Sequence, residues 1–328
     1  MKQNTVSMQS TGNFAINTAG KLLQWVDSHS QINAPTENST DKKVDWLRVI
    51  PFLFMHLMCL GVIWVGWSPV AVVIAFALYF LRMLAITGFY HRYFSHKSFK
   101  TSRIAQFIFA VLGASAAQRG PLWWASHHRH HHIHSDNQED AHSPKQHGFL
   151  WSHMGWFTDN SNFPPKLQRI PDLVKFKELI WLDRFDAIVP IILAIGLYAF
   201  GELLAATAPS LNTNGSQLLI WGFFISTVIL YHATYTVNSL AHKFGKRRYN
   251  TKDDSRNSFL IALITCGEGW HNNHHHFPGS ASQGFFWWEV DMTYYFLRFL
   301  AWTGIIWDLK AVPAELKNSR LVKARKQK

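Results

Sequence analysis

Four apolar stretches, each about long enough to cross a lipid bilayer, constrain the fold of this chain more than any other feature. They occupy residues 46–67, 69–90, 187–208 and 217–238. Only three charged residues interrupt them: Arg48, Arg82 and Glu202. Because about twenty apolar residues in a helix span the hydrocarbon core of a membrane, the sequence predicts an all-α integral membrane protein with four transmembrane helices. Four buried helices of a soluble domain are the less favoured alternative.

The distribution of basic residues predicts how the four spans are oriented. The tight link between the first two spans and the link between the last two, residues 207–217, contain neither Lys nor Arg. Basic residues gather instead before the first span, between the second and third, and after the fourth. Since positive residues accumulate on the cytoplasmic side, we expect two short hairpins and both termini in the cytoplasm. Residues 91–186 and 239–313 would then form a cytoplasmic helical cap.

The segments outside this domain of residues 45–313 are polar. Residues 1–44 lack the apolar core of a signal peptide and are expected to be mobile, and residues 314–328 form a basic tail that is expected to be solvated. The net charge of +12 fits a membrane surface, and no motif for binding RNA or DNA accompanies it. The sequence therefore predicts lipid contact and no nucleic-acid partner.

The chain has 19 histidines, many of which gather in three short clusters. These are HRYFSH (91–96), HRHHH (128–132) and HNNHH (271–275). The second and third clusters share the spacing H-x-x-H-H, which puts three imidazoles on one helical face, where they can converge on one point. His242, just after the fourth span, adds a ninth imidazole. Because all these segments follow cytoplasmic span ends, one site outside the bilayer could collect them.

Nine imidazoles are too many for one metal ion and suit two. Such ligation fits iron, zinc, copper or nickel, and the two cysteines, Cys59 and Cys266, form no zinc-finger pattern. A soluble di-iron carboxylate bundle needs glutamate ligands on core helices. The spans offer only Glu202, at the wrong end of the third, so that class is excluded.

Other residues near the clusters are expected to support the ligands. Asp136, Asp140 and Glu268 are candidate acceptors for the second imidazole N–H, because metal-bound histidines usually donate that proton to a carboxylate or carbonyl. Solvated loop charges are the alternative interpretation of these acids. Three more histidines point partly away from the ligand face and are expected to be surface or supporting residues: His127, His130 and His134.

The three histidine boxes on four spans resemble the membrane fatty-acid desaturases, and most closely the stearoyl-CoA (delta-9 acyl-CoA) branch. The stretches SHMGW (152–156), NSLAH (238–242) and GEGWHNNHHHFP (267–278) add to the resemblance. It implies two iron ions that use O2 to place a cis double bond, at delta-9, in a saturated long-chain acyl-CoA. The implied ligands are His91, His96, His128, His131, His132, His242, His271, His274 and His275, with Asn238 acting through a water.

The resemblance also implies a bent tunnel for the acyl chain, with Gln118, Trp124, Thr234 and Tyr235 at its kink. The second span leads into His91 and rises about 1.5 Å per residue. Tyr79 therefore lies roughly 18 Å deeper than His91, with Ala75 one turn below it. We expect these two side chains to close the tunnel, although packing against a neighbouring helix is an equal alternative.

The acyl carrier and the electron donor are less constrained. Ser126 and His127 stand where the animal enzymes have an Arg-Asp pair that contacts CoA, and TDNSNFPPK (158–166) lacks their basic pair. Acyl-CoA stays the first expectation and a membrane glycerolipid the second. No fused electron carrier is visible, so we expect a separate ferredoxin, rubredoxin or haem cytochrome with its reductase. These features favour a bacterial inner membrane.

Two rival functions remain. A histidine-box hydroxylase shares the metal site and differs in how the substrate carbon lies against it. A membrane metal transporter needs polar groups within its spans to line a path, and besides the three charged residues the spans offer chiefly His56. We therefore favour the desaturase.

Overall fold

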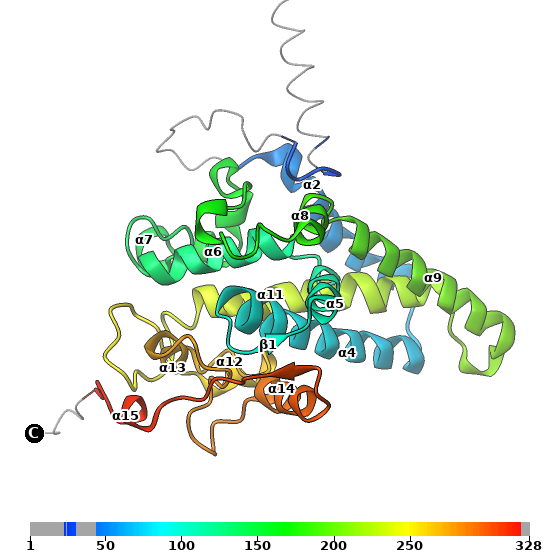
Figure 1. Cartoon of the computed structure of the whole chain (residues 1–328). Coiled ribbons are helices and arrows are strands. Elements are labelled where there is room, and N and C mark those ends of the chain that lie inside the picture. The colour runs from blue at the N-terminus through cyan, green and yellow to red at the C-terminus, as the bar shows by residue number, and fades with distance from the viewer. Residues whose placement is uncertain (1–22, 24, 31–43, 323–328) are drawn as a thin grey trace, which may run out of the picture.

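The computed structural model describes residues 23, 25–30 and 44–322, and it is mostly helical (Figure 1). The helices are α2 (Trp46–Met58), η1 (Cys59–Gly61), α3 (Val62–Val65), α4 (Pro69–Leu84), η2 (Ala85–Ser95), α5 (Arg103–Ala114), α6 (Pro121–His134), α7 (Pro144–His147), η3 (Trp151–Gly155), η4 (Trp156–Thr158), η5 (Asn160–Asn162), η6 (Leu167–Arg169), α8 (Lys177–Arg184), α9 (Ile188–Thr207), η7 (Pro209–Leu211), α10 (Gly215–Gln217), η8 (Leu218–Ile225), α11 (Ser226–Ser239), α12 (Phe259–Ile264), α13 (His271–His276), α14 (Met292–Trp302) and α15 (Ala314–Lys317). Two short antiparallel strands pair with each other: β1 (Lys100–Thr101) and β2 (Ile306–Trp307).

Four helices are long and apolar enough to cross a membrane, which confirms the predicted number. They run over Trp46–Val65, Pro69–Ser95, Ile188–Thr207 and Gly215–Ser239. The turn between the first two follows from local chemistry. Gly66 adopts a positive φ of 65°, and the Ser68 hydroxyl accepts a hydrogen bond from the Ala71 amide at the start of α4. Proline at the first position of α4 needs no amide partner there.

The second span is longer than predicted, because it continues past residue 90 as the π-helix η2. Helix α14 supports this extension. The hydroxyls of Thr87 and Thr293 lie 2.7 Å apart, and an added Cβ at Gly88 would meet Leu297 at 3.5 Å. The span therefore carries its apolar helix directly into the first histidine cluster.

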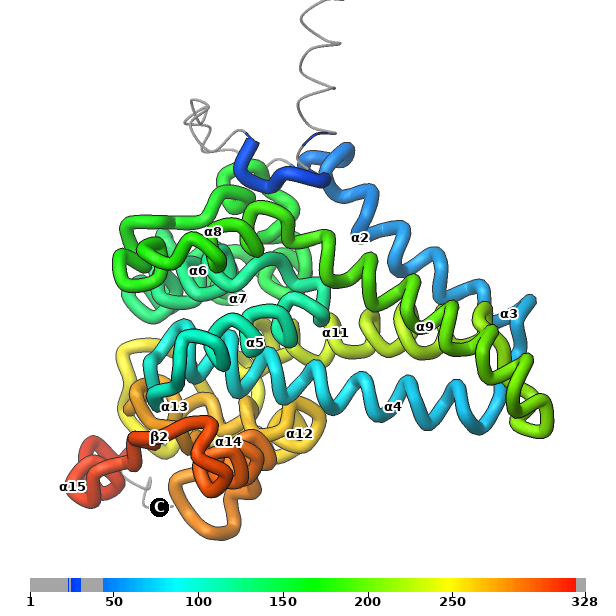
Figure 2. Tube along the Cα trace, turned by 45° about the vertical axis from the view of Figure 1, so that its right-hand side comes forward, coloured from blue at the N-terminus to red at the C-terminus, as the bar shows by residue number. Residues whose placement is uncertain are grey.

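The spans and the predicted cap segments occupy opposite ends of the molecule (Figure 2). The turn between α3 and α4 and the link between α9 and α11 lie together at the far right of that view. At the left, helices α6, α7 and α8 lie on one side of the α4–η2 and α11 ends, and α12, α13 and α14 lie on the other. The two cap segments thus face each other across the ends of two spans.

Parts of the expected terminal segments contact the rest of the protein. Asp27 pairs with Arg184 at 2.6 Å, so residues 25–30 pack on the cap. The prediction of a mobile segment otherwise falls on residues 1–22, 24 and 31–43, outside the described residues. Near the other end, His276 Nε2 lies 2.9 Å from the Leu316 carbonyl. Residues 323–328 of the predicted tail also lie outside the described chain.

Candidate metal centre

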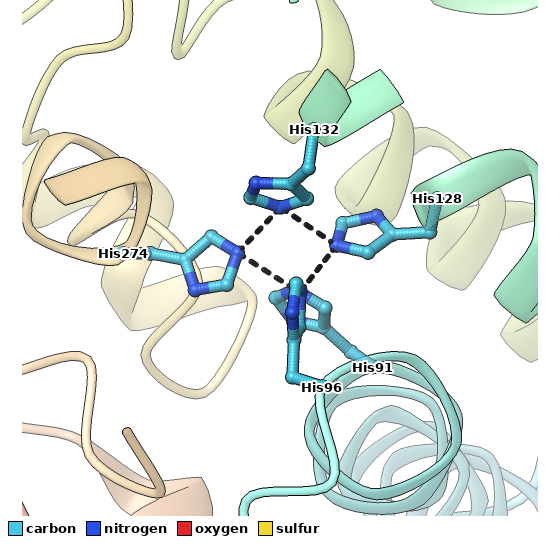
Figure 3. Close-up of side chains that lie close together, drawn as sticks. All are labelled: His91, His96, His128, His132 and His274. Carbon is cyan, nitrogen blue, oxygen red and sulfur yellow. Dashed lines mark hydrogen bonds between the residues drawn. The ribbon is translucent and has the colours of Figure 1, made fainter. Parts of the chain in front are cut away.

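Five histidines from three helices converge in the first of two groups. They are His91, His96, His128, His132 and His274. Figure 3 shows their rings pointing toward one another from η2 and its C-cap residue His96, from α6 and from α13. The Nε2 atoms of His96 and His128 lie 2.8 Å apart, and those of His132 and His274 lie 2.9 Å apart. Five imidazole nitrogens therefore face one small volume.

Four further histidines form the second group: His131, His242, His271 and His275. The Nε2 atoms of His242 and His271 are 3.0 Å apart. His242 lies just after α11, whereas the other three come from α6 and α13. The two groups together contain the same nine histidines that the resemblance named. Their role as ligands stays a prediction, because no ion is present.

The π-helix explains how the first cluster joins the site. In an α-helix, residues five apart point about 140° away from each other. In η2 the His96 amide donates to the His91 carbonyl at 3.3 Å, an i to i+5 bond that closes one wide turn. The two rings consequently lie 5.0 Å apart in the same group.

The H-x-x-H-H clusters do not converge on one point, contrary to the sequence-based expectation. His128 and His132 enter the five-histidine group, whereas His131 enters the other. In the third cluster, likewise, His274 parts from His271 and His275. Residues i and i+4 differ by about 40° around a helix, but i+3 and i+4 differ by about 100°. Each cluster can therefore supply two adjacent sites at once.

Each of four histidines has a carboxylate on its Nδ1 atom. The pairs are His242–Asp136 at 2.9 Å, His131–Asp140 at 3.0 Å, His275–Asp253 at 2.8 Å, and His91–Glu268 in close contact. Three of these acids were predicted acceptors. Asp253 was missed, because it lies in a polar loop where no motif marks it. A proton fixed on Nδ1 leaves the Nε2 lone pair free for a cation.

Burial and neighbouring charges set the protonation of these groups. Burial, reinforced by adjacent imidazoles, holds the pKa well below its usual value at His96, His128, His132, His271 and His274. Burial alone would raise the pKa values of the carboxyls. Hydrogen bonds and charges from the imidazoles nevertheless lower the pKa of Asp136, Asp140 and Asp253. Those five imidazoles are therefore neutral and the three carboxyls ionised, whereas at His131 burial is outweighed by the Asp140 charge, which raises the pKa.

These residues fit two bound cations. Because the carboxylates hold the protons on Nδ1, the Nε2 lone pairs of facing histidines point toward one another. A shared cation would stabilise this arrangement. His275 Nε2 is buried and has no hydrogen-bond partner among the described residues. Four carboxylates also balance the charge of two divalent ions. The donor set contains no thiolate, which agrees with a histidine-rich metal centre.

The other histidines near the second cluster bind backbone or side chains instead. His127 Nε2 lies 3.1 Å from the Pro164 carbonyl and His130 Nε2 lies 3.1 Å from that of Glu139. His134 lies beside Arg169. His142 was not among the predicted site residues. It forms a smaller cluster with His131 and Asp140.

A cavity of about 620 Å³ leads away from the histidines into the apolar interior between the spans. Its lining includes His91, His128, His131 and His271 at one end and Phe223 and Phe224 of η8 among the apolar walls. The predicted kink residues all line it: Gln118, Trp124, Thr234 and Tyr235. Asn238 lines it as well. Gln118 donates to the Thr234 hydroxyl at 2.9 Å, and this bond links the loop before α6 to α11 in the cavity wall.

Tyr79 and Ala75 are not among the residues that line this cavity, and the expectation that they close a tunnel stays a prediction. The Tyr79 hydroxyl donates to the Ile264 carbonyl of α12, and its ring packs against the core beneath the cap. Ala75 is buried. Neither side chain faces the space that this cavity encloses.

A family model decides the identity of the fold. The model described as fatty acid desaturase matches residues 66–305, which is most of the chain and includes all three histidine clusters. This chain belongs to the fatty acid desaturase family. The family membership rests on the whole matched region and not on the histidine clusters alone.

Curated relatives of the desaturase differ in substrate. It is 38% identical over 285 residues to the palmitoyl-monogalactosyldiacylglycerol delta-7 desaturase of Arabidopsis thaliana, covering 85% of this chain and 72% of that one. It is 35% identical over 301 residues to the acyl-CoA C20 Delta5-desaturase of Anemone leveillei, covering 88% and 91%. It is 36% identical over 275 residues to the sn-1 stearoyl-lipid 9-desaturase of Anabaena variabilis, covering 83% and 96%. The relatives therefore include both acyl-lipid and acyl-CoA enzymes.

Proposed function

We propose that this desaturase is an O2-dependent di-iron enzyme that introduces a cis double bond into a saturated long-chain fatty acyl group. The observation that carries the proposal is the junction of nine converging histidines with an apolar cavity. Family membership supports the reaction class, and the donor set supports iron. The nine histidines are the proposed ligands, and Asn238 is proposed to act through a water.

Breaking an unactivated C–H bond needs a strong oxidant, which bound iron and O2 would supply. The protein's own part is to hold the chain and exclude water. Aromatic and aliphatic walls surround the acyl group, and the Gln118–Thr234 bond fixes the wall close to the histidines. Asp136, Asp140, Asp253 and Glu268 keep the Nδ1 proton in place on their histidines.

Delta-9 is our proposed position of the double bond, as the resemblance implies. Related enzymes are named for positions 9, 7 and 5, so position depends on how far the chain enters. Acyl-CoA was the first expectation for the carrier. The opening of the cavity between α2 and α9, and the two arginines that line the cavity, support the second, a membrane glycerolipid. Electrons are proposed to come from a separate ferredoxin, rubredoxin or haem cytochrome and its reductase.

We also propose that the four spans form two hairpins with the cap and both termini in the cytoplasm of a bacterial inner membrane. The absence of Lys and Arg from the two links at the far end supports this orientation. Figure 2 agrees with it, because both links lie at the end opposite the cap.

Mass spectrometry of lipids from cells that express the chain tests the reaction. Cells with the wild-type protein should gain a cis double bond at one position, located by fragmentation, and cells with His274→Ala should not. A hydroxylated product would instead identify the histidine-box hydroxylase. Unchanged lipids, in cells where the protein is folded and loaded with iron, would refute the proposal.

A further inference from the structure

We infer that the acyl chain enters sideways from the bilayer, through a slot between α2 and α9, while still attached to a phosphate-bearing glycerolipid. This inference rests on the proposed function and specifies its substrate class. The slot is defined by Phe54 of α2, by Ile191 and Ile195 of α9, and by Phe223 and Phe224 of η8 behind them. All five side chains line the cavity that reaches the histidines.

The packing of three helices creates the slot. Helices α2 and α9 both pack against η8 but do not pack along each other. Phe223 and Phe224 of η8 are buried between them. The space between α2 and α9 is therefore backed by aromatic rings and has no third helix in front of it among the described residues.

The slot residues face outward as well as inward. Phe54, Ile191 and Ile195 are 49%, 55% and 64% exposed, yet each lines the cavity. A side chain that both lines a cavity and faces the surroundings marks an opening in the cavity wall. Since these helices are apolar spans, the surroundings here are lipid chains. An acyl tail can move through this opening without crossing water.

The aqueous side of the cavity is covered. Trp25 and Ser28 line the cavity from the N-terminal segment, which crosses the start of α2 and the end of α8 (Figure 2). The Trp25 indole donates to the Leu47 carbonyl at 3.1 Å, and Asp27 is held by Arg184. An acyl chain carried by a soluble molecule would have to displace this segment. A chain that comes from the membrane would not.

Two guanidinium groups lie where the polar head of such a lipid would rest. Arg48 stacks on the Phe163 ring at 3.6 Å, and the charges of Asp45 and Asp186 act on its guanidinium group. Arg119 pairs with Asp186 at 2.8 Å. Both arginines line the cavity, and of the two acids near Arg48 only Asp186 lines it with them. Guanidinium groups bind phosphate oxygens in pairs.

The position of these two arginines along the membrane normal matches the position expected for a lipid head group. Arg48 lies in the first turn of α2, three residues after the N-cap Asp45, at the cap end of the first span. Arg119 adopts a positive φ of 70°, and so does Ala117 at 54°, on either side of Gln118. Such backbone conformations are uncommon outside glycine and gather at functional sites. The loop therefore holds Arg119 near the cavity at an energetic cost.

Photoaffinity labelling tests the route without requiring iron or turnover. The probes are phosphatidylglycerol with a diazirine on its stearoyl chain and stearoyl-CoA with the same diazirine, each offered to the full-length protein in lipid nanodiscs. We expect phosphatidylglycerol to label peptides of α2 and α9, and unlabelled phosphatidylglycerol to compete better than unlabelled stearoyl-CoA. Preferred labelling by stearoyl-CoA, or labelling elsewhere, would overturn the inference.

Variants on one helix sharpen the test. Ile195→Trp should narrow the slot and reduce labelling about tenfold, because the larger side chain takes up part of the opening. Ile192→Trp is the matched control. Ile192 is 63% exposed on the same helix but does not line the cavity, so labelling should not change. Equal labelling of both variants would contradict the slot. Competition in the wild-type protein decides the question if Ile195→Trp does not fold.

The head-group contact is tested by charge removal. Arg48→Gln should weaken phosphatidylglycerol labelling and leave labelling by a galactosyl diacylglycerol with the same chain unchanged. Arg103→Gln, on the exposed surface of α5, is the control. Equal effects on both lipids would overturn the phosphate assignment. The inference can fail while cells still gain double bonds, and lipid can label the slot in a chain that makes none, so its failure differs from failure of the proposed function.

Discussion

The rings of His132 and His275 stack with centroids 4.5 Å apart, and each belongs to a different histidine group. The two groups therefore lie in contact, and the contact is made by their own proposed ligands. His131 and His132 of α6, and His274 and His275 of α13, diverge in the same way. Two helices thus set the spacing of both sites, and a shift of either helix changes both together.

Removal of one ligand from each group should empty the sites separately. His274→Ala should lose the cation of the five-histidine group, and His131→Ala that of the four-histidine group. Turnover should fall more than about 100-fold in both, since even supporting residues cost 10–100-fold. His134→Ala is the control, because His134 lies outside both groups. Metal per protein, measured by plasma mass spectrometry, checks this; full metal and turnover in either ligand variant would contradict it.

Asp253 should matter to metal affinity although it binds no cation itself. Asp253→Asn removes the negative charge at His275 Nδ1 and should weaken metal binding by about 10–100-fold. Asp254→Asn is a neighbouring control, since the Asp254 side chain pairs with Lys145 at 3.1 Å. Competition with a chelator of known affinity measures the change. Identical affinities in the two variants would show that Asp253 has no such role.

Metal removal should destabilise the folded protein. Without cations, ionised carboxylates and facing lone pairs are buried together. A ligand present at about a thousandfold above its Kd stabilises a fold by about 4 kcal/mol. Chelation should therefore lower the melting temperature, and Fe2+ should restore it. Asp253→Asn should reduce the difference between the loaded and metal-free melting temperatures. A melting temperature that the chelator does not change would argue against bound cations.

The ion pair between Arg129 and Asp172 should give the metal-free protein a pH-dependent stability. Burial would raise the pKa of Asp172, but hydrogen bonds from Arg129 and Lys97 outweigh it and lower the pKa to about 2. A lowered carboxyl pKa stabilises the fold above the unfolded value near 4, and this contribution is lost as pH falls towards 2. Asp172→Asn should cost about 2 kcal/mol near neutral pH.

Thermal melts of the metal-free protein at several pH values check this, so that metal release does not contribute. The difference between wild type and Asp172→Asn should shrink as the pH falls from about 5 to about 3. Asp308→Asn serves as the control, because Asp308 is 59% exposed where it pairs with Lys100. A constant difference across this range would mean that Asp172 acts through packing and not through charge.

Membrane orientation has a direct test. A reporter enzyme fused after Lys328 should be active in the cytoplasm, because the links at the far end of the spans lack basic residues. The same reporter inserted in the link of residues 207–217 should respond from the opposite side. Swapped responses would reverse the proposed orientation and leave the fold unaffected.

The sequence was most informative where chemistry is periodic or concentrated. Apolar length predicted four spans, and repeated H-x-x-H-H spacing predicted which histidines gather. Both patterns can be recognised in the sequence without knowledge of how the helices pack. His91 and His96 were harder, since residues five apart separate in an α-helix, and only the π-turn of η2 brings them together. No local sequence pattern that we recognise marks that turn.

Features set by helix rotation or by distant loops were not predictable. Tyr79 faces Ile264 and not the cavity, because a span's rotation follows from its neighbours and not from its own sequence. His131 and His132 belong to different histidine groups, which can be recognised only once the two groups are placed side by side. Asp253 reaches His275 from a polar loop 22 residues earlier. The slot exists because α2 and α9 share η8 as a partner.

The position of α13 in the chain has a consequence for biogenesis. Both histidine groups draw on α13, which follows all four spans in the sequence. Chains emerge from the ribosome N-terminus first, so every span is synthesised, and can enter the bilayer, before either group is complete. Neither proposed cation site can therefore be completed until all four candidate spans have been synthesised.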